Sequence, residues 1–273
     1  MLISPIEHNI PTPASATGDA NLRLALTKRA STGRLTWSGP LLLITGRSVL
    51  MIAAQAFVVC LSWVRFHVWS WNGAAKWWTV YGTLVDAGCL ALMAAYTRKE
   101  GIRLRDLIGR VRLRWGRDFF VGVGCLLLVL PFFALGFPAA RWLIYGSTHP
   151  PTFAGMLSAR VLPLWGVAYS LSAWWLVWSP TEEMTYNGYA LPRIEVLSGG
   201  RWKAVAIVGF WWALQHSFLP FILDWQYVAG RFFAFLPGVV AFLLIYLRLR
   251  RLPPLILAHW AMDISAVFFT LQF

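Results

Sequence analysis

Long runs of apolar residues constrain this chain more than any other feature. From about residue 39 onward they follow one another with short polar interruptions, and a run of about 20 apolar residues can cross the roughly 30 Å hydrocarbon core of a bilayer as a helix. Only 13% of the 273 residues are charged and 58% are hydrophobic, whereas soluble domains carry about a quarter charged residues. Because backbone polar groups in lipid must be satisfied within the chain, we expect an all-α, multi-pass membrane helical bundle.

About seven transmembrane helices are expected, or eight if the longest run is two crossings. The spans cover roughly residues 41–64, 77–97, 118–137, 161–192, 203–222, 231–248 and 254–271. The fourth would be about 48 Å long at ~1.5 Å per residue, and it contains Pro180, where we expect a kink or a break. Residues 1–38 are polar and predict a mobile tail. Residues 39–273 predict the membrane domain, with its motif-bearing core in 160–273.

The formal net charge of +13 is distributed as expected for a membrane protein. Most Lys and Arg residues fall in the segments on the N-terminal side of the membrane, with Arg47 counted among them, and this asymmetry predicts a cytoplasmic N-terminus and an outside C-terminus in the cell (inner, cytoplasmic) membrane. The basic residues are therefore expected to meet membrane lipids and no nucleic acid. Cys60, Cys89 and Cys125 lie in apolar segments without metal or disulfide spacing and are expected to act as small hydrophobes.

Ionisable residues inside the apolar spans are the candidates for function, because each must be paired, solvated or neutralised. They are Glu182 and Glu183 in SPTEEMTYNGYALPR, His216 in FWWALQHSF, and His259 and Asp263 in AHWAMD. At ~1.5 Å per residue, four of them lie about 12–20 Å from the inner ends of three separate spans. The similar depth predicts one shared site. The i, i+4 spacing of His259 and Asp263 lets the acid orient the imidazole.

The two adjacent glutamates are expected to have different roles. On a helix Glu182 shares a face with Tyr186 and Tyr189, whereas Glu183 points about 100° away and shares a face with Asn187. Glu183 is therefore expected to support the site, and Glu182 to carry the chemistry.

Each feature also has an ordinary structural explanation. Residues 179–182 read as a capping box with a proline at the first helical position. A single histidine such as His216 can bond to a neighbouring backbone, and His259 with Asp263 can be a structural pair. Asp86, in the second span, is best explained as a polar contact between helices. For the other residues the combination favours catalysis over three separate coincidences.

The three motifs together resemble the CPBP family of intramembrane glutamic proteases, which includes the CAAX-processing endopeptidases and prokaryotic relatives. The family patterns EExxxR, FxxxH and HxxxN or HxxxD read here as Glu182-Glu183-Met-Thr-Tyr-Asn187, Trp212-Ala-Leu-Gln-His216 and His259-Trp-Ala-Met-Asp263.

Two positions depart from the pattern. Trp212 replaces a phenylalanine and keeps an aromatic wall. Asn187 replaces an arginine, which removes a positive charge that could hold a glutamate ionised, so Arg193 or another donor would have to compensate.

The resemblance implies hydrolysis of a peptide bond by an activated water, without a cofactor. Glu182 would be the general base, His216 would position the water and pass a proton to the leaving amine, and His259, oriented by Asp263, would stabilise the oxyanion. Glu183, Asn187, Tyr186 and Trp212 would support these groups. The site would need a conical polar cavity open toward the inside face. The expected partner is a membrane-anchored substrate with a lipidated, CAAX-like or hydrophobic tail.

Two alternatives remain open at this point. Glu182, His216, His259 and Asp263 are also the ligand types of a zinc site, which would make the chain a metal-dependent membrane protease. The same buried acids and histidines also suit a proton-coupled transporter, or a catalytically inactive membrane scaffold in which Asn187 marks a degenerate site.

Overall fold

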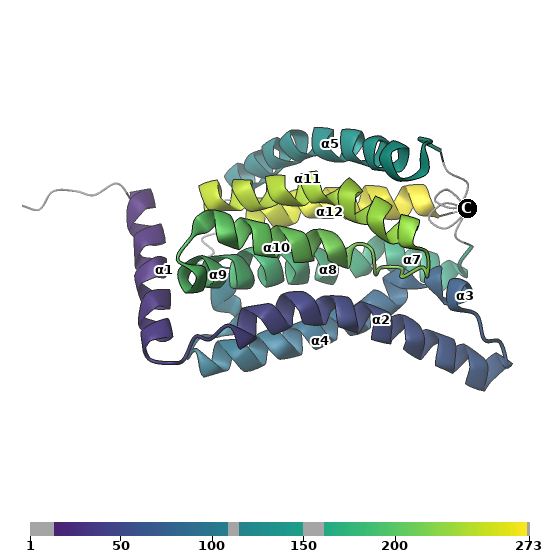
Figure 1. Cartoon of the computed structure of the whole chain (residues 1–273), viewed down its shortest axis with the longest axis horizontal. Helices are drawn as coiled ribbons and strands as arrows, with labels where there is room; N and C mark the ends of the chain where they lie inside the picture. The colour runs from purple at the N-terminus through teal and green to yellow at the C-terminus, as the bar shows by residue number, and fades with distance from the viewer. Residues whose placement is uncertain (1–13, 109–114, 150–160, 272–273) are drawn as a thin grey trace, which may run out of the picture.

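The computed structural model describes residues 14–108, 115–149 and 161–271. Regular structure in these ranges is helical, which confirms the all-α fold class. The helices are α1 (Ala14–Ser31), α2 (Ser38–Phe66), α3 (Trp71–Ala75), α4 (Trp78–Lys99), η1 (Leu104–Leu107), α5 (Trp115–Tyr145), α7 (Leu164–Ser172), α8 (Trp174–Glu183), η2 (Met184–Ala190), α9 (Leu191–Ser198), α10 (Arg201–Gln215), α11 (Trp225–Leu249) and α12 (Pro253–Thr270). Figure 1 shows the long helices running side by side, with α1 across one end.

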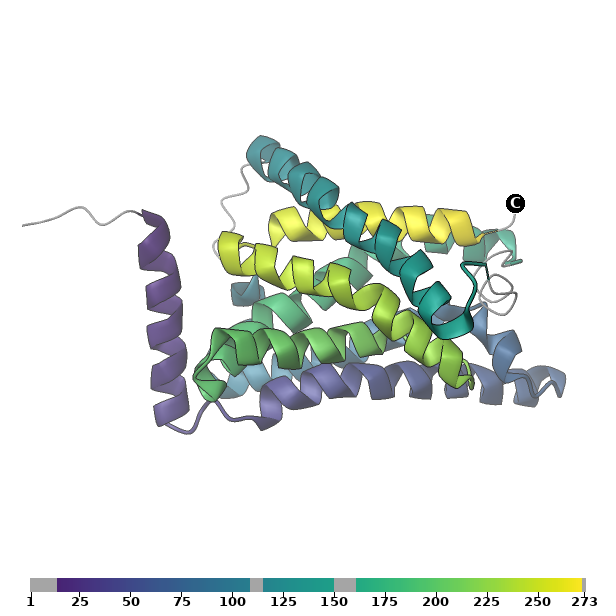
Figure 2. The same ribbon diagram turned by 45° about the horizontal axis from the view of Figure 1, so that its top comes forward.

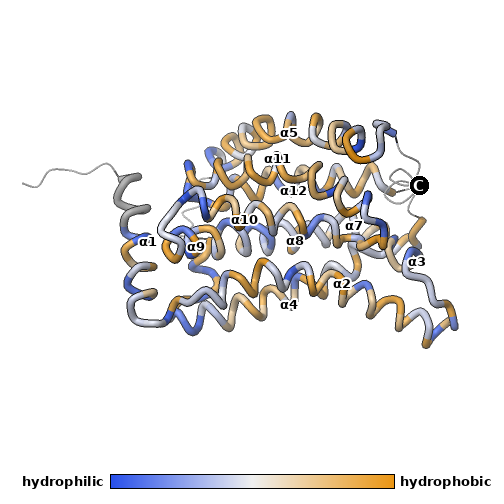
Figure 3. The backbone as a smooth tube through the Cα atoms, in the orientation of Figure 1, coloured by the Kyte–Doolittle hydropathy of each residue, from blue (hydrophilic) through white to orange (hydrophobic). Residues whose placement is uncertain are grey.

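Among the described residues, four helices are long and apolar enough to cross a membrane: α2, α4, residues 116–145 of α5, and α11. They correspond to four of the expected spans. Their outer faces carry large exposed apolar side chains, such as Leu42, Phe57, Phe120 and Leu135, and Figure 3 shows the apolar colouring along these helices. Contiguous exposed apolar surface of this kind is rare on soluble monomers and is suited to contact with lipid.

The expected fourth span is broken, but not at Pro180. The chain turns at Ala173, between α7 and α8, and Pro180 lies inside α8. A proline removes one backbone donor and crowds the preceding turn, which this helix accommodates without ending. The departure from α-helical geometry comes four residues later in η2, which is π-helical. The expected capping box at residues 179–182 is therefore wrong, because these residues are inside a helix rather than at its start.

The expected fifth span is shorter than the apolar run that predicted it. Helix α10 ends at Gln215, and residues 216–224 connect it to α11. The Asp224 side chain accepts hydrogen bonds from the backbone N–H groups of Gln226 and Tyr227, at 2.8 and 3.3 Å, and so caps the start of α11. His216 is consequently at the end of a helix, where the backbone leaves the helical path.

Part of the segment expected to be a mobile tail is helical. Helix α1 packs against α9, with Leu26 buried. Residues 1–13 of the expected tail lie outside the described residues. In both Figure 1 and Figure 2, α1 lies across the end of the bundle where α5 begins and α11 finishes. The helix thus covers one end of the membrane domain.

Helix packing surrounds α8 with other helices. Helix α5 packs along α11 and α12, α10 along α11, and α2 along α4, while α4 and α12 both contact α8. The approach of α5 to α11 is close: a Cβ added to Gly136 would lie 2.7 Å from the backbone oxygen of Ala234. Because α8 is enclosed in this way, Glu182 and Glu183 at its end are fully buried.

Candidate active site

A cavity of about 500 Å³ lies beside the end of α8. Glu182, Trp212, His216, His259 and Asp263 all line it. The structure therefore brings the four residues expected to be catalytic to one cavity, from α8, from the end of α10 and from α12. The remaining lining is mainly aromatic and aliphatic, including residues of α5 and α11.

The lining residues give the position of the cavity within the bundle. The lining comes from the later parts of α5 and α12 and the first two thirds of α11, which form the half of the bundle away from α1 (Figure 1). The conical polar cavity open toward the inside face, expected because the bilayer excludes bulk water, stays a prediction.

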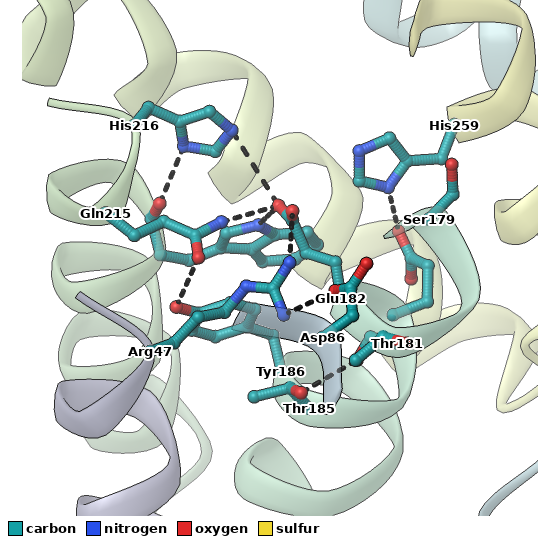
Figure 4. A network of polar contacts seen from close by, with 12 residues as sticks. Arg47, Asp86, Ser179, Thr181, Glu182, Thr185, Tyr186, Gln215, His216 and His259 are labelled. Carbon is teal, nitrogen blue, oxygen red and sulfur yellow. Dashed lines mark hydrogen bonds and ion pairs between the residues drawn. The ribbon is translucent and has the colours of Figure 1, made fainter. Parts of the chain in front are cut away.

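Both carboxylate oxygens of Glu182 have partners, as Figure 4 shows. Oε1 accepts hydrogen bonds from Nε1 of Trp212 and from Nε2 of Gln215, the latter at 2.6 Å. Oε2 lies 3.4 Å from Nη2 of Arg47. The Tyr186 hydroxyl donates to Gln215 at 2.9 Å, and its ring stacks on that of Trp212 with centroids 4.9 Å apart. The carboxylate is therefore held at both oxygens by groups from two other helices, α10 and α2.

His216 faces the same carboxylate with one nitrogen. Its Nδ1 lies 2.8 Å from the backbone oxygen of Trp212, and its Nε2 lies 3.7 Å from Oε1 of Glu182. A carbonyl oxygen only accepts hydrogen bonds, so Nδ1 carries a hydrogen in this contact. The ring stacks on Phe235 with centroids 3.8 Å apart, and Arg231 donates to the His216 carbonyl oxygen at 2.5 Å. Ring and backbone are thus both fixed, and Nε2 is directed at Glu182.

His259 is held mainly by Glu183. Its Nδ1 lies 3.0 Å from Oε1 of Glu183, whereas its Nε2 lies 3.8 Å from Oδ1 of Asp263. Asn187 donates to the other oxygen of Glu183 at 2.7 Å. The expectation that Asp263 orients His259 is therefore corrected: the closer acid is Glu183, because the i, i+4 pair on α12 is separated by more than a hydrogen bond. Glu183 does not line the cavity, which agrees with its expected supporting position.

Asp263 has its hydrogen bond with a residue of α8. The Ser179 hydroxyl donates to Oδ2 of Asp263 at 2.5 Å. Ser179 is thus a link between α8 and α12 rather than a helix cap. The sequence signal for this contact was the spacing of Ser179 and Glu183, which are one helical turn apart and therefore lie on the same face of α8.

Arg47 and Gln215 are the two contacts of Glu182 that sequence reasoning missed. Arg47 was counted as a loop charge on the N-terminal side, but it is fully buried in α2. Its Nη1 lies 3.2 Å from Oδ1 of Asp86, which agrees with the interpretation of Asp86 as a contact between helices. The missed signal was a charge inside an expected apolar span, which by default indicates a functional or paired group. For Gln215, the missed signal was a polar amide side chain directly before His216 in an apolar span.

Arg193 does not take the place of the arginine that Asn187 replaces. Its Nε and Nη2 donate to the two oxygens of Glu100, both at 2.7 Å, and its Nη1 donates to the backbone oxygen of Tyr189 at 3.0 Å. This is a bidentate pair of the kind favoured by the planar guanidinium. The cation beside Glu182 is Arg47 instead.

Within the described residues, no three His, Cys, Asp or Glu side chains are placed so that they could hold one metal ion. The four residues considered for zinc line one cavity, with Glu182 3.7 Å from His216 and His259 3.8 Å from Asp263, and zinc binding by them stays an alternative.

Comparison with known protein families gives one match. Residues 163–265 match the family model described as Type II CAAX prenyl endopeptidase Rce1-like. This segment is Rce1-like. It contains all three motifs, from Glu182 to Asp263, so the family recognised from them is confirmed. Neither the curated proteins nor the solved structures gave a match to the chain. The Rce1-like segment and the apolar helices together support a membrane peptidase.

Proposed function

We propose that this protein is an intramembrane endopeptidase that hydrolyses a peptide bond of a membrane-anchored substrate with an activated water. The observation that carries the proposal is the meeting of Glu182, His216, His259 and Asp263 on one cavity inside an apolar bundle. Their elements lie far apart along the chain, so neither helix periodicity nor capping requires them to meet there. The Rce1-like match supports a peptidase as the class of enzyme.

Glu182 is assigned as the general base. A water in the cavity donates to Oε2 of Glu182, the oxygen with a free acceptor position, and lies near His216, whose Nε2 is 3.7 Å from Oε1. This water transfers a proton to the carboxylate while its oxygen attacks the carbonyl carbon. The carbon–nitrogen bond then breaks, and the proton passes by way of His216 to the leaving amine. No covalent enzyme intermediate forms in this scheme.

His259 is assigned to the oxyanion. Its Nδ1 is occupied by Glu183 at 3.0 Å, so its Nε2 is the nitrogen left toward Asp263 and the cavity. A hydrogen on that nitrogen stabilises the negative charge that develops on the carbonyl oxygen. Asp263 lies 3.8 Å from the same nitrogen and supports the protonated ring electrostatically.

The substrate is a peptide whose lipidated, CAAX-like or hydrophobic tail occupies the apolar part of the cavity. Aromatic residues such as Phe133, Phe137 and Phe235 provide walls for such a tail. We further propose that α12, α10 and the α7–α9 segment lie in the membrane with the four long helices, which gives seven or eight embedded elements. The N-terminus is placed in the cytoplasm, with membrane lipids as the other partners.

The deciding experiment compares Glu182→Gln with wild type in proteoliposomes. The probes are two quenched fluorescent peptides, one with a farnesylated CAAX end and one with an unlipidated hydrophobic tail. We expect Glu182→Gln to abolish cleavage. Glu195→Gln is the matched control, because Glu195 is equally buried but pairs with Arg201 and Arg250 at 3.2 and 3.1 Å. A folded Glu182→Gln protein that cleaves at the wild-type rate would refute the assignment.

The same preparation tests the alternatives. Cleavage that disappears with a chelator and returns with zinc would favour metal-dependent hydrolysis. Proton flux that depends on Glu182 without any cleaved product would favour a transporter, and neither activity would favour a scaffold. Labelling of single cysteines from each side of the membrane tests the number of embedded elements and the orientation.

A further inference from the structure

The buried Arg47 has a position that neither the three motifs nor the family match explains. It lies on α2, outside residues 163–265, yet its guanidinium lies between the carboxylates of Asp86 on α4 and Glu182 on α8, at 3.2 and 3.4 Å. The flat face of the guanidinium lies over the Trp178 ring, with Cζ 4.2 Å from the ring centroid. Figure 4 shows Arg47 on the opposite side of Glu182 from His216 and His259.

We propose that Arg47 is the positioning residue that keeps Glu182 ionised and oriented for its role as base. The inference rests on the proposed function of Glu182. Arg47 does not line the cavity, whereas Glu182 does, so Arg47 acts through the carboxylate rather than on the substrate.

A buried carboxylate needs a compensating charge or donors to stay ionised. Burial favours the neutral acid, whereas a cation within about 4–6 Å favours the carboxylate. Hydrogen bonds from Trp212 and Gln215 reach only Oε1 of Glu182. Arg47 supplies the full positive charge at Oε2. Without it, Glu182 takes up a proton and can no longer accept one from water.

Two other polar groups that could have stabilised the charge of Glu182 are bound to other acids. Asn187 donates to Glu183 at 2.7 Å. Arg193 is bound to Glu100 through two contacts of 2.7 Å. His216, 3.7 Å from Glu182, and His259, on the same cavity, also face this carboxylate, but their charge changes with pH and with the reaction. Arg47, from a helix far away in sequence, is the cation beside Glu182 that stays charged throughout.

Asp86 and Trp178 hold the guanidinium in place. Asp86 accepts from Nη1, which leaves Nη2 for Glu182, and the aromatic ring covers one face of the cation with a favourable cation–π contact. A planar group that contacts two acids and a ring at once has little freedom to turn. These contacts therefore hold the positive charge of Arg47 in a fixed place beside Glu182.

The test separates a role in ionisation from a role in folding. Arg47→Met alone would leave Asp86 as an unpaired buried acid, so the informative variant is Arg47→Met with Asp86→Asn, compared with Asp86→Asn alone. Infrared difference spectra against the same proteins carrying Glu182→Gln report whether Glu182 is protonated, without using a substrate. We expect the carbonyl band of a protonated Glu182 at neutral pH in the protein without Arg47, and its absence in Asp86→Asn and wild type.

Kinetics give the second readout, with the farnesylated fluorescent peptide. Loss of Arg47 should shift the acid limb of the pH–rate profile to higher pH. Each pH unit of this shift lowers the rate at a given pH on that limb about tenfold. Activity should recover at alkaline pH, which a merely structural defect would not allow. Arg47→Lys keeps the charge and should restore most of the activity. Arg193→Met, which removes an equally buried arginine, should leave the acid limb where it is.

Each outcome decides the proposal. An unmoved acid limb and no acid band in a folded Arg47→Met, Asp86→Asn protein would overturn it, as would a protonated Glu182 in wild type. If the double variant does not fold, the wild-type spectrum and Arg47→Lys decide instead. Wild type that cleaves neither peptide contradicts the proposed function, while the infrared comparison still tests the effect of Arg47 on Glu182.

Discussion

Replacing Trp212 with phenylalanine tests whether its indole N–H or its ring shape matters to the site. The indole Nε1 donates to Oε1 of Glu182, while the ring stacks on Tyr186 with an interplanar angle of 3°. Phenylalanine keeps an aromatic surface against Tyr186 and removes the donor. It is also the usual residue in the motif that this segment resembles. The substitution therefore isolates one hydrogen bond to a buried carboxylate.

The expected magnitude follows from what remains around Glu182. A hydrogen bond to a charged group contributes about 1.5–3 kcal/mol to stability, and we expect a loss in this range. Gln215 and Arg47 still contact the carboxylate, so Glu182 should remain ionised and the enzyme active. Misalignment of the base should lower kcat by about tenfold or less, which corresponds to about 1.4 kcal/mol.

The assay combines chemical unfolding in detergent micelles with cleavage of the fluorescent peptide. Trp211→Phe is the matched control, because Trp211 is the next residue on α10, is partly buried, and makes an edge contact with Phe210. It should change stability by less than about 1 kcal/mol and leave kcat unchanged. Equal effects of the two substitutions would refute the argument, since ring size rather than the bond to Glu182 would then explain the loss.

Two further predictions concern the second glutamate and the helix packing. Glu183→Gln should lower kcat by roughly 10–100-fold with little change in KM, because the charged partner of His259 at 3.0 Å is lost; an unchanged kcat would contradict this role. Gly136→Ala should destabilise the protein by about 1–3 kcal/mol, since the added Cβ would lie 2.7 Å from the Ala234 backbone oxygen. Gly124→Ala on the same helix meets nothing within 4 Å and should be neutral or stabilising in unfolding measurements.

The helical bundle could be predicted because an apolar run of about 20 residues is long enough to cross a bilayer and must then be helical. The breaks within it could not be predicted in the same way. Residues 161–192 read as one long, mainly apolar run, but hydropathy does not report which backbone acceptor each N–H finds. The change from α8 to the π-helical η2 accompanies full burial of Glu182 and Tyr186 against other helices, and such tertiary contacts override local preference.

The site residues show the same difference between local sequence patterns and tertiary contacts. Glu182, His216 and His259 could be identified because each belongs to a short local pattern. Arg47 could not, because its contact with Glu182 spans 135 residues and no spacing rule relates the two. Its position near the start of an apolar run also matched the rule for topological charges, which concerns the ends of helices and does not detect a charge that packs inward.

The contacts also explain why the two adjacent glutamates are not equivalent. A carboxylate has about four acceptor positions. At Glu182, Trp212 and Gln215 occupy the two positions of Oε1 and Arg47 occupies one of Oε2. Because this carboxylate lines the cavity, the fourth position, on Oε2, is available to a water. Glu183 is equally buried but does not line the cavity and is bound by Asn187 and His259. A base must both stay charged and reach its substrate. Of the two carboxylates, Glu182 meets both requirements, whereas Glu183 can act on the reaction only through His259.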